Sequence, residues 1–340
     1  MLWLHLVCRF DMITIIISCP DKKIKRVIHT SPLLFPKKCV IIIHYTIWRD
    51  GCAESRLIMF EIVSKVSLND STEKMTVKAP LVAAKAMPGQ FVIIRADEYA
   101  ERIPLTVADY DRVAGTVTVI FQKVGMSTEK LGTLRTGDYL QDFVGPLGTA
   151  SHLDGLRRVA VIGGGLGCAI AYPQAKYLHQ AGTEVDMIVG FRNADLIILE
   201  EEMRAACTNL ILMTDDGSRG DKGFVTDALK AQLERGVEYD EVIAIGPPVM
   251  MKFVSLLTKQ YGVKTIVSMN PIMIDGTGMC GGCRVTVGGK VKFACVDGPE
   301  FDGHEVDFDE LIRRNSAYVA QERESAHRYN CNLMKKAEQN

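Results

Sequence analysis

The spacing of apolar residues changes once along the chain, near Leu156, and this change limits the fold more than any other feature. Between Met59 and about Gly148, short apolar alternations such as QFVIIRA and GTVTVIFQKV are separated by the turn signals PGQ and RTGD. Such alternation indicates strands with one buried face. From Leu156 onward, apolar strands such as VAVIGGG and EVDMIVGF alternate with helical segments. We therefore expect a small antiparallel β-barrel, followed by an α/β domain with a parallel sheet.

Length and charge are those of a globular protein with two domains and a small appendage. The 340 residues are 47% hydrophobic, and their net charge is −1. A charge near zero creates no general attraction for nucleic acid or anionic lipid, so we expect neither nucleic acid nor a membrane as a partner. No secretory signal is evident, which predicts a cytoplasmic protein whose reduced thiols are available as metal ligands.

The first 58 residues differ in composition from the remainder. They contain both tryptophans and nine Lys or Arg against four Asp or Glu, which gives +5 there and −6 elsewhere. Apolar runs such as CVIIIHYTIW are half as long as the roughly 20 residues that span a bilayer. We expect Met59 to be the biological start and residues 1–58 to be a non-native or poorly ordered extension. The alternative is a genuine extension that covers a partner.

A glycine-rich turn lies between the strand VAVIGGG and the next helix. Its bare backbone would let a pyrophosphate approach the N–H groups that begin the helix. The fingerprint G-x-G-x-x-G does not fit, because Cys168 stands where the third glycine is needed. A standard dehydrogenase is therefore disfavoured, and a tight packing turn is the alternative to a phosphate site. The nucleotide contacts expected here are Gly163, Gly164, Gly165 and Gly167.

The order of barrel and nucleotide domain, together with several motifs, resembles the ferredoxin–NADP reductase superfamily. PGQF resembles a barrel strand of that family, and the segment RIPLT resembles a lengthened form of its flavin motif R-x-x-[ST]. The resemblance implies that Arg102 pairs with the FAD pyrophosphate and that Thr106 lies near flavin N5. Pro104 and Leu105 would contact the same cofactor. The planar guanidinium fork suits phosphate, although Arg102 alone could equally be a surface ion-pair partner.

Three further segments carry the same resemblance. GMST resembles the pyrophosphate turn G-x-x-[ST], GPLG resembles the loop that closes the flavin domain, and GPPVM resembles the G-P-x-x-M loop beside the nicotinamide. Their order and spacing support one another. The resemblance thus assigns cofactor contacts to Gly125, Ser127, Thr128, Gly246, Pro247 and Met250.

Charged residues after two strands bear on the choice between NADH and NADPH. Arg192 and Arg219 could hold a 2′-phosphate, whereas Asp215 and Asp216 would repel one. We therefore favour NAD(H) over NADP, with Arg192 and Asp216 as nucleotide contacts.

Four residues near the C-terminal end have the spacing D-x4-C-x2-C-x11-C: Asp275, Cys280, Cys283 and Cys295. With Cys in place of the Asp, the first three positions match the C-x4-C-x2-C of plant-type 2Fe-2S loops. A carboxylate can offer an anionic oxygen to iron, so we predict a 2Fe-2S cluster with all four as ligands. The alternatives are a zinc site, a C-x-x-C redox pair, unligated thiols, or a cluster in which Asp275 is a bystander.

Together these features resemble the electron-transfer subunits of the dihydroorotate dehydrogenase B type. MIDGTGMCGGCRVTVGGKVKFAC and GFRNADLIILEEEM resemble most the small subunits of NADH-dependent reduced ferredoxin:NADP oxidoreductases, also called sulfide dehydrogenase beta subunits. A short hairpin, RVTVGGKVKFAC, is expected beside the cluster. The predicted regions are an FAD-binding barrel at 59–153, an NAD-binding domain at 154–265, a cluster region at 266–312 and a tail at 313–340.

The resemblance implies a flavin and 2Fe-2S oxidoreductase subunit that passes electrons between NAD(H), FAD and a larger flavin and iron–sulfur subunit. Electron bifurcation with ferredoxin and NADP is part of that expectation, and ferredoxin is a further candidate partner. One alternative is the electron-transfer subunit of NAD-dependent dihydroorotate dehydrogenase. An alternative from another class is a non-catalytic nucleotide- or zinc-binding adaptor.

Overall fold

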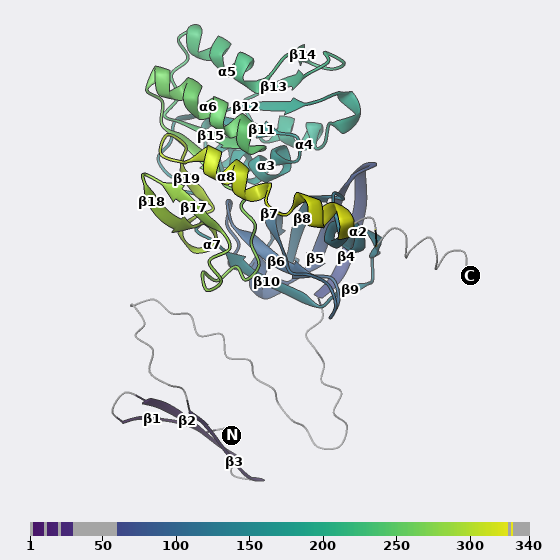
Figure 1. Ribbon diagram of the computed structural model, residues 1–340, viewed down its shortest axis with the longest axis vertical. Coiled ribbons are helices and arrows are strands. Elements are labelled where there is room, and N and C mark those ends of the chain that lie inside the picture. Colours follow the sequence, from purple (N-terminus) through teal and green to yellow (C-terminus); the bar gives the residue numbers. More distant parts are fainter. Residues whose placement is uncertain (1–2, 10–11, 20–21, 30–59, 326–327, 329–340) are drawn as a thin grey trace, which may run out of the picture. The chain divides into compact units, whose positions relative to one another are not determined.

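The computed structural model describes residues 3–9, 12–19, 22–29, 60–325 and 328, and the chain divides into the units 1–55 and 56–340. In the first unit, three strands form an antiparallel sheet: β1 (Trp3–Arg9), β2 (Met12–Cys19) and β3 (Lys22–His29). The predicted start at Met59 lies outside the described residues. All that follows concerns the second unit (Figure 1).

The second unit begins with seven antiparallel strands in the order β10-β6-β7-β8-β5-β4-β9. The two edge strands, β9 and β10, are consecutive in the chain and are separated by Gln141 alone, so the sheet nearly closes on itself as a barrel. The Gln141 N–H donates to the Arg95 carbonyl at 3.0 Å. The strands are β4 (Phe60–Asn69), β5 (Thr72–Lys78), β6 (Phe91–Arg95), β7 (Ile103–Asp111), β8 (Thr116–Gln122), β9 (Tyr139–Leu140) and β10 (Asp142–Leu147).

Alternating residues of these strands fill the barrel. Met75, Val77, Val117 and Val119 are fully buried, as the period of two predicts. Two short helices, α1 (Pro80–Ala83) and α2 (Met126–Thr133), accompany the barrel.

The next domain is a parallel sheet with the strand order β14-β13-β12-β11-β15-β16, and β19 joins it antiparallel to β16. The strands are β11 (Arg158–Gly164), β12 (Glu184–Phe191), β13 (Asn209–Thr214), β14 (Asp221–Lys222), β15 (Glu241–Ile245), β16 (Thr265–Ser268) and β19 (Glu300–Asp302). The connections between the parallel strands carry helical segments, as strand and helix alternation predicts, except the short connection from β13 to β14. These are α3 (Gly167–Gln180), η1 (Ala194–Leu196), α4 (Glu200–Ala205), α5 (Val225–Glu234) and α6 (Pro248–Tyr261).

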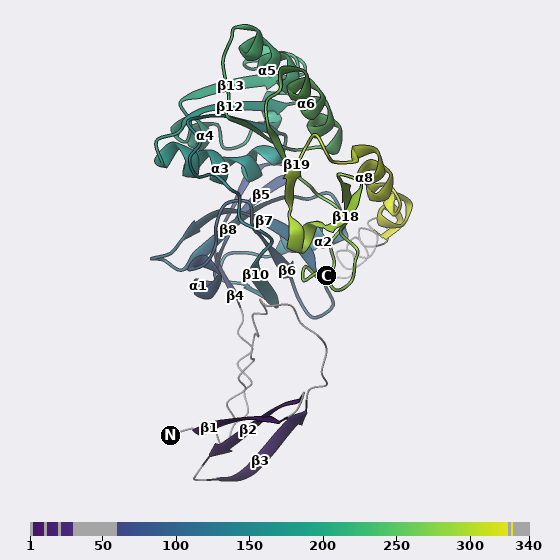
Figure 2. The same ribbon diagram turned by 90° about the vertical axis from the view of Figure 1, so that its left-hand side faces the viewer.

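Both faces of this sheet are covered, which explains its continuous apolar strands. Val159 and Val161 of β11 pack into the apolar cluster of α3 and α4, whereas Ala160 and Ile162 pack into that of α5 and α6. Figure 2 shows the two helix pairs on opposite sides of the sheet. The predicted fold class, a barrel followed by an α/β parallel-sheet domain, is confirmed.

The cysteine-rich region follows β16. Its hairpin, β17 (Arg284–Val287) and β18 (Lys290–Phe293), turns at two glycines with φ of 56° and 71°, so the predicted hairpin and its turn are confirmed. Helix α7 (Ala294–Asp297) leads into β19, and α8 (Phe308–Asn315) follows. Cys283 and Cys295 belong to the same apolar cluster as Ile93 of the barrel and Ile162 of the parallel sheet. The region therefore shares its core with both larger domains.

Candidate functional site

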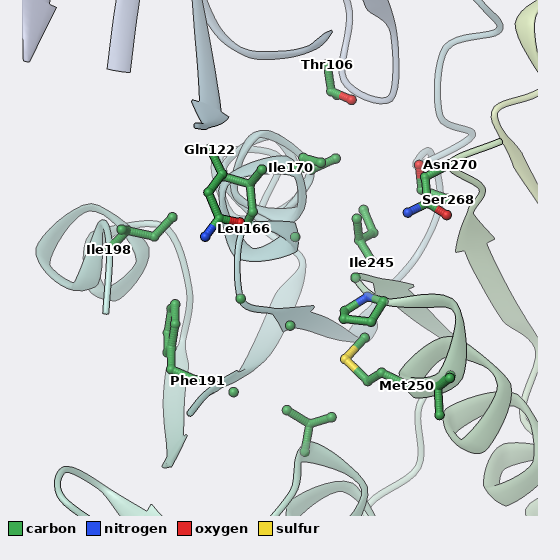
Figure 3. Close-up of a pocket in the computed structure, with 18 of the residues that line it drawn as sticks. Thr106, Gln122, Leu166, Ile170, Phe191, Ile198, Ile245, Met250, Ser268 and Asn270 are labelled. Atoms are coloured by element: carbon green, nitrogen blue, oxygen red, sulfur yellow. The ribbon is translucent and has the colours of Figure 1, made fainter. Parts of the chain in front are cut away.

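A cavity of about 1070 Å³ lies between the barrel and the carboxyl ends of the parallel strands. The strand ends supply Gly164, Gly190, Ile245 and Ser268, and β7 supplies Thr106 from the opposite side. Open α/β sheets bind ligands at this edge. Figure 3 shows Thr106 at the top of the cavity, Met250 below it, and Ser268 and Asn270 at the right.

The glycine-rich turn between β11 and α3 forms part of the cavity wall. Gly165 has φ of +55°, and a Cβ built on it would meet nothing within 4 Å. A Cβ on Gly167 would instead lie 2.3 Å from the Ile245 carbonyl oxygen, and one on Gly163 would lie 2.7 Å from Cys168 Cα. Gly165 therefore leaves open space at the start of α3, while the other two glycines allow close packing.

The GPPVM loop lies against this turn. Met250 lines the cavity, and its sulfur would lie 2.4 Å from a Cβ built on Gly164. Gly246 and Pro247 line the same wall. The two segments singled out as pyrophosphate and nicotinamide contacts thus form one continuous surface.

Only some of the charged residues expected near the ribose line the cavity. Arg192 and Asp215 line it, whereas Asp216 accepts hydrogen bonds from the backbone and hydroxyl of Ser218. Arg219 forms an ion pair with Glu200 at 2.9 Å, which holds the pKa of that carboxyl below its usual value. An arginine already paired in this way has less capacity for a 2′-phosphate, and Asp215 adds a negative charge beside the cavity.

On the barrel side, the middle of the flavin motif reaches the cavity but its arginine does not. Pro104, Leu105 and Thr106 line the wall, and Thr106 pairs in register with Phe91 of β6. Arg102 is exposed and precedes β7. The motif therefore extends from the cavity to the outer surface of the barrel.

The GMST turn forms the beginning of α2, beyond the cavity. The Thr128 hydroxyl accepts a hydrogen bond from the Gly125 N–H at 3.2 Å and so caps the helix. The Ser127 hydroxyl donates to Glu101 at 2.6 Å, beside Arg102. This contact brings the two segments predicted to hold the FAD pyrophosphate next to each other.

Several cavity residues were missed in the sequence. Ser268 ends β16 and Asn270 follows it, and Phe91 and Gln122 come from barrel strands. Phe91 lies in the PGQF segment, which was assigned to a barrel strand but not to the cavity, and no motif marks the other three, because their presence at the cavity depends on where distant strands end. The position of Ser268 at the carboxyl end of a parallel strand was the only available signal.

In the cysteine loop, Cys283 and Cys295 are buried, with their sulfur atoms 3.2 Å apart. Burial is the main cause that raises the pKa of Cys295 to about 12. Cys280 is exposed, and the Gly282 N–H, 3.5 Å from its sulfur, lowers its pKa. Two thiolates on one tetrahedral metal with bonds of about 2.3 Å lie about 3.8 Å apart, so the two buried sulfur atoms, at 3.2 Å, would have to separate by about 0.6 Å to share a metal.

The Asp275 carboxylate turns back into its own loop. It accepts hydrogen bonds from the Thr277 hydroxyl and N–H and from the Met279 N–H at 3.3 Å, and the Thr277 hydroxyl is the main cause that lowers its pKa. Among the described residues, no three His, Cys, Asp or Glu side chains are close enough to hold one metal. The structure therefore brings together two of the four predicted ligands.

The loop packs directly on the barrel. A Cβ on Gly276 would lie 2.9 Å from Ile93 and 3.0 Å from Leu147. Ile93 pairs in register with Pro104, which lines the cavity. One barrel strand, β6, thus separates the cysteine loop from the flavin motif.

A reductase-type barrel, a parallel nucleotide-binding sheet and a cysteine loop define a flavin-dependent iron–sulfur oxidoreductase. Residues 161–256 match the family model of the oxidoreductase NAD-binding domain. Residues 270–307, which contain all four predicted ligands, match that of the iron–sulfur cluster binding domain of dihydroorotate dehydrogenase B. This match favours an iron–sulfur cluster over zinc or a redox pair.

Whole-chain comparisons agree with these matches. An "uncharacterized protein in adh 3'region" of Clostridium beijerinckii is 53% identical over 78% of this chain and 92% of its own length. A Thermotoga maritima homolog of the dihydroorotate dehydrogenase B (NAD(+)) electron transfer subunit is 46% identical, over 79% of this chain and 95% of its own length. The third match is a chain from the structure of NADH-dependent reduced ferredoxin-NADP oxidoreductase, which is described in terms of flavin-based electron bifurcation. It is 45% identical, with a TM-score of 0.76, and the match covers 83% of this chain and 99% of that one.

The chain belongs to the family of dihydroorotate dehydrogenase B electron-transfer subunits and their homologues. It is an NAD(P)H-linked oxidoreductase subunit, and the predicted cofactors FAD, NAD(H) and a 2Fe-2S cluster are confirmed at the level of its domains and fold. Across the residues that the structure describes, no helix is both long and apolar enough to cross a membrane.

Proposed function

We propose that this chain passes electrons between NADH and a larger partner subunit, through FAD in the cavity and a 2Fe-2S cluster in the cysteine loop. When bound, FAD takes an electron pair as hydride and the cluster carries single electrons, which is chemistry that side chains cannot supply. Gly165 and the start of α3 would receive the pyrophosphate of NADH. Gly246, Pro247 and Met250 would hold the nicotinamide facing Thr106.

The observation that carries this proposal is the arrangement around β6. The flavin motif on β7 pairs with one edge of β6, and Gly276 of the cysteine loop packs against Ile93 of the same strand. Neighbouring strands lie about 4.8 Å apart. The side chains predicted to hold the two redox groups therefore lie within a few strand widths of one another, which suits transfer of single electrons.

An exposed apolar rim around the cysteine loop supports a protein partner. Ile274, Met279 and Val296 are 58%, 87% and 46% exposed. Ile274 lies 4.0 Å from the Cβ position of Gly282, and Val296 lies 3.1 Å from that of Gly278. Apolar side chains gathered beside a redox site are typical of a docking surface, so we infer that the larger subunit covers this rim.

The test uses the full chain reconstituted anaerobically with iron and FAD. Cys283→Ala should abolish the visible and paramagnetic signals of the cluster, while NADH still bleaches the flavin. Cys207→Ala is the matched control, because Cys207 is also buried but lies outside the loop, and it should retain both signals. A wild-type chain that binds no flavin or iron, or whose flavin NADH leaves oxidised, would refute the proposal.

Sequence similarity to a bifurcating enzyme favours a further step. In this step the partner combines electrons from NADH, delivered by this chain, with electrons from reduced ferredoxin to reduce NADP, and in the reverse direction it divides the electron pair of NADPH between ferredoxin and this chain. The second candidate is an NAD-dependent dihydroorotate dehydrogenase, favoured by the names of several relatives at 30 to 34% identity. The ferredoxin-linked structure, at 45% identity, is more similar to this chain than these relatives are, and the 46% identical Thermotoga maritima relative carries the dihydroorotate dehydrogenase name only as a homolog, so we favour the first. Co-purification of the native complex, followed by assays with dihydroorotate and with reduced ferredoxin plus NADP, separates them. No observation favours the adaptor alternative.

A further inference from the structure

A carboxyl group that the proposed electron path does not use lies where the barrel meets the parallel sheet. Glu300 begins β19, and its Oε1 accepts hydrogen bonds from the Ser151 hydroxyl at 2.8 Å and from the Gln174 amide of α3. A Cβ on Gly89 of the barrel would lie 2.9 Å from the same oxygen. The barrel, the connecting segment, α3 and β19 therefore meet at one carboxyl group.

The hydrogen bonds at this junction indicate the protonation state of Glu300. Gln174 is fully buried, and its Oε1 has no hydrogen-bond partner among the described residues. A carboxylate has only acceptors and cannot satisfy that oxygen, whereas a carboxylic acid can donate to it. The protonated acid and the amide would then form a closed pair, with one hydrogen bond in each direction.

The electrostatic surroundings agree with this geometry. Burial is the main cause that raises the pKa of Glu300 to about 7, and the charge of Glu241 on β15 raises it further. Glu241 itself pairs with Lys264 at 2.5 Å. The groups that contact Glu300 from the barrel turn, the connecting segment and α3 are Gly89, Ser151 and Gln174, none of which is charged.

The junction is connected to the cavity through β16 and β19. Glu300 pairs in register with Ser268, which lines the cavity, so their side chains project from the same face of the sheet. Pro299, the residue before Glu300, also lines the cavity. A shift of β19 at Glu300 would therefore move two parts of the cavity wall relative to the barrel.

We propose that Glu300 is a positioning residue which, as a neutral carboxylic acid paired with the Gln174 amide, sets the spacing of the barrel and the nucleotide-binding domain across the cavity. Its effect on electron transfer rests on the proposed function, because that spacing separates the flavin from the nicotinamide. Loss of the proton places an unpaired charge beside the buried Gln174 oxygen and loosens the junction. A displacement of about 1 Å between reacting groups can cost about a hundredfold in rate.

The test compares Glu300→Gln, Glu300→Ala and the control Asp302→Asn in the full chain loaded with FAD. Gln can form the same two hydrogen bonds with Gln174 but cannot ionise, whereas Asp302 lies on the same strand with 43% of its side chain exposed. In wild type and Asp302→Asn, flavin reduction at saturating NADH should slow about tenfold or more as pH rises through about 7. Glu300→Gln should keep the fast rate throughout, and Glu300→Ala should be slow at every pH.

Two measurements on the same variants are independent of turnover. The infrared band of a buried carboxylic acid should be present below neutral pH in wild type and Asp302→Asn, should disappear as pH rises through about 7, and should be absent in Glu300→Gln. A raised pKa means that the folded state holds the proton more tightly than the unfolded state, so wild-type Tm should fall between pH 4.5 and about 7. Glu300→Gln should lack that part of the fall.

Identical pH profiles in wild type and Glu300→Gln, or no acid band in wild type, would overturn this inference. If NADH does not reduce the wild-type flavin, the proposed function fails instead, and the infrared band and Tm still report on Glu300.

Discussion

Gly167→Ala tests whether the phosphate turn and the nicotinamide loop are held together by close backbone packing. The new Cβ would lie 2.3 Å from the Ile245 carbonyl oxygen and 2.7 Å from Gly246 Cα. Both are backbone atoms and cannot rotate away, so β15 and α3 must separate. Gly to Ala within a helix otherwise stabilises by roughly 0.5 to 1 kcal/mol, whereas overpacking costs about 1 to 3 kcal/mol. Because both clashes are with backbone atoms, we expect the cost of overpacking to exceed the gain, with a net loss of up to about 2.5 kcal/mol.

Gly132→Ala is the matched control for this variant. Gly132 also lies within a helix, but its Cβ would meet only the flexible side chain of Lys123, at 2.9 Å. Denaturant unfolding of the FAD-loaded protein should show a loss for Gly167→Ala and little change or a small gain for the control. NADH titration by flavin bleaching should show weaker binding in Gly167→Ala alone. A Gly167→Ala variant with undiminished stability and unchanged NADH affinity would refute the packing argument.

Two further predictions concern charged groups. Asp186 is 2% exposed and accepts from Arg158, from Asn209 at 2.7 Å and from Tyr239 at 2.8 Å. Asp186→Ala should lower the free energy of unfolding by about 3 to 5 kcal/mol. The exposed control Asp195→Ala should change it by less than about 0.5 kcal/mol. Equal losses of stability in the two variants would show that the hydrogen bonds to Asp186 do not stabilise the fold. Asp215→Ser removes a negative charge from the cavity wall. KM for NADPH should therefore fall several-fold, while KM for NADH changes little. An unchanged ratio of KM for NADPH to KM for NADH would argue against repulsion of a 2′-phosphate by Asp215.

The sequence was sufficient for the elements whose signal is local. Apolar alternation predicted β6 and β8, apolar runs alternating with helical segments predicted the parallel strands, and the glycine pair predicted the turn of the β17–β18 hairpin. Gly164, Gly165 and Gly167 line the cavity, where a glycine-rich turn between a strand and a helix can bind phosphate, although Gly167 also serves the close packing that was the alternative. These features depend on residues that are neighbours in the chain.

Features that depend on distant residues could not be predicted. Gln174 and Glu300 are 126 positions apart, and neither belongs to a motif. The addition of β19 to the parallel sheet was missed for the same reason, since its three residues carry no periodicity. The roles assigned to Arg102, Asp216 and Asp275 remain predictions, because these side chains lie outside the cavity or are engaged within their own loops.

The position of β19 beside β16 has a consequence for how the metal-binding segment is built. Residues 269–299 connect the end of β16 to the start of β19, which lie side by side in the sheet. The Met269 N–H donates to the Pro299 carbonyl at 2.9 Å and so joins the two ends of this segment. The ends of this segment are held together, so it behaves as a closed loop. The entropic cost of lengthening such a loop grows only with the logarithm of its length. The length of the cluster-binding segment can therefore vary while its two ends stay paired beside β16, although its buried cysteines remain part of the core that it shares with the barrel and the parallel sheet.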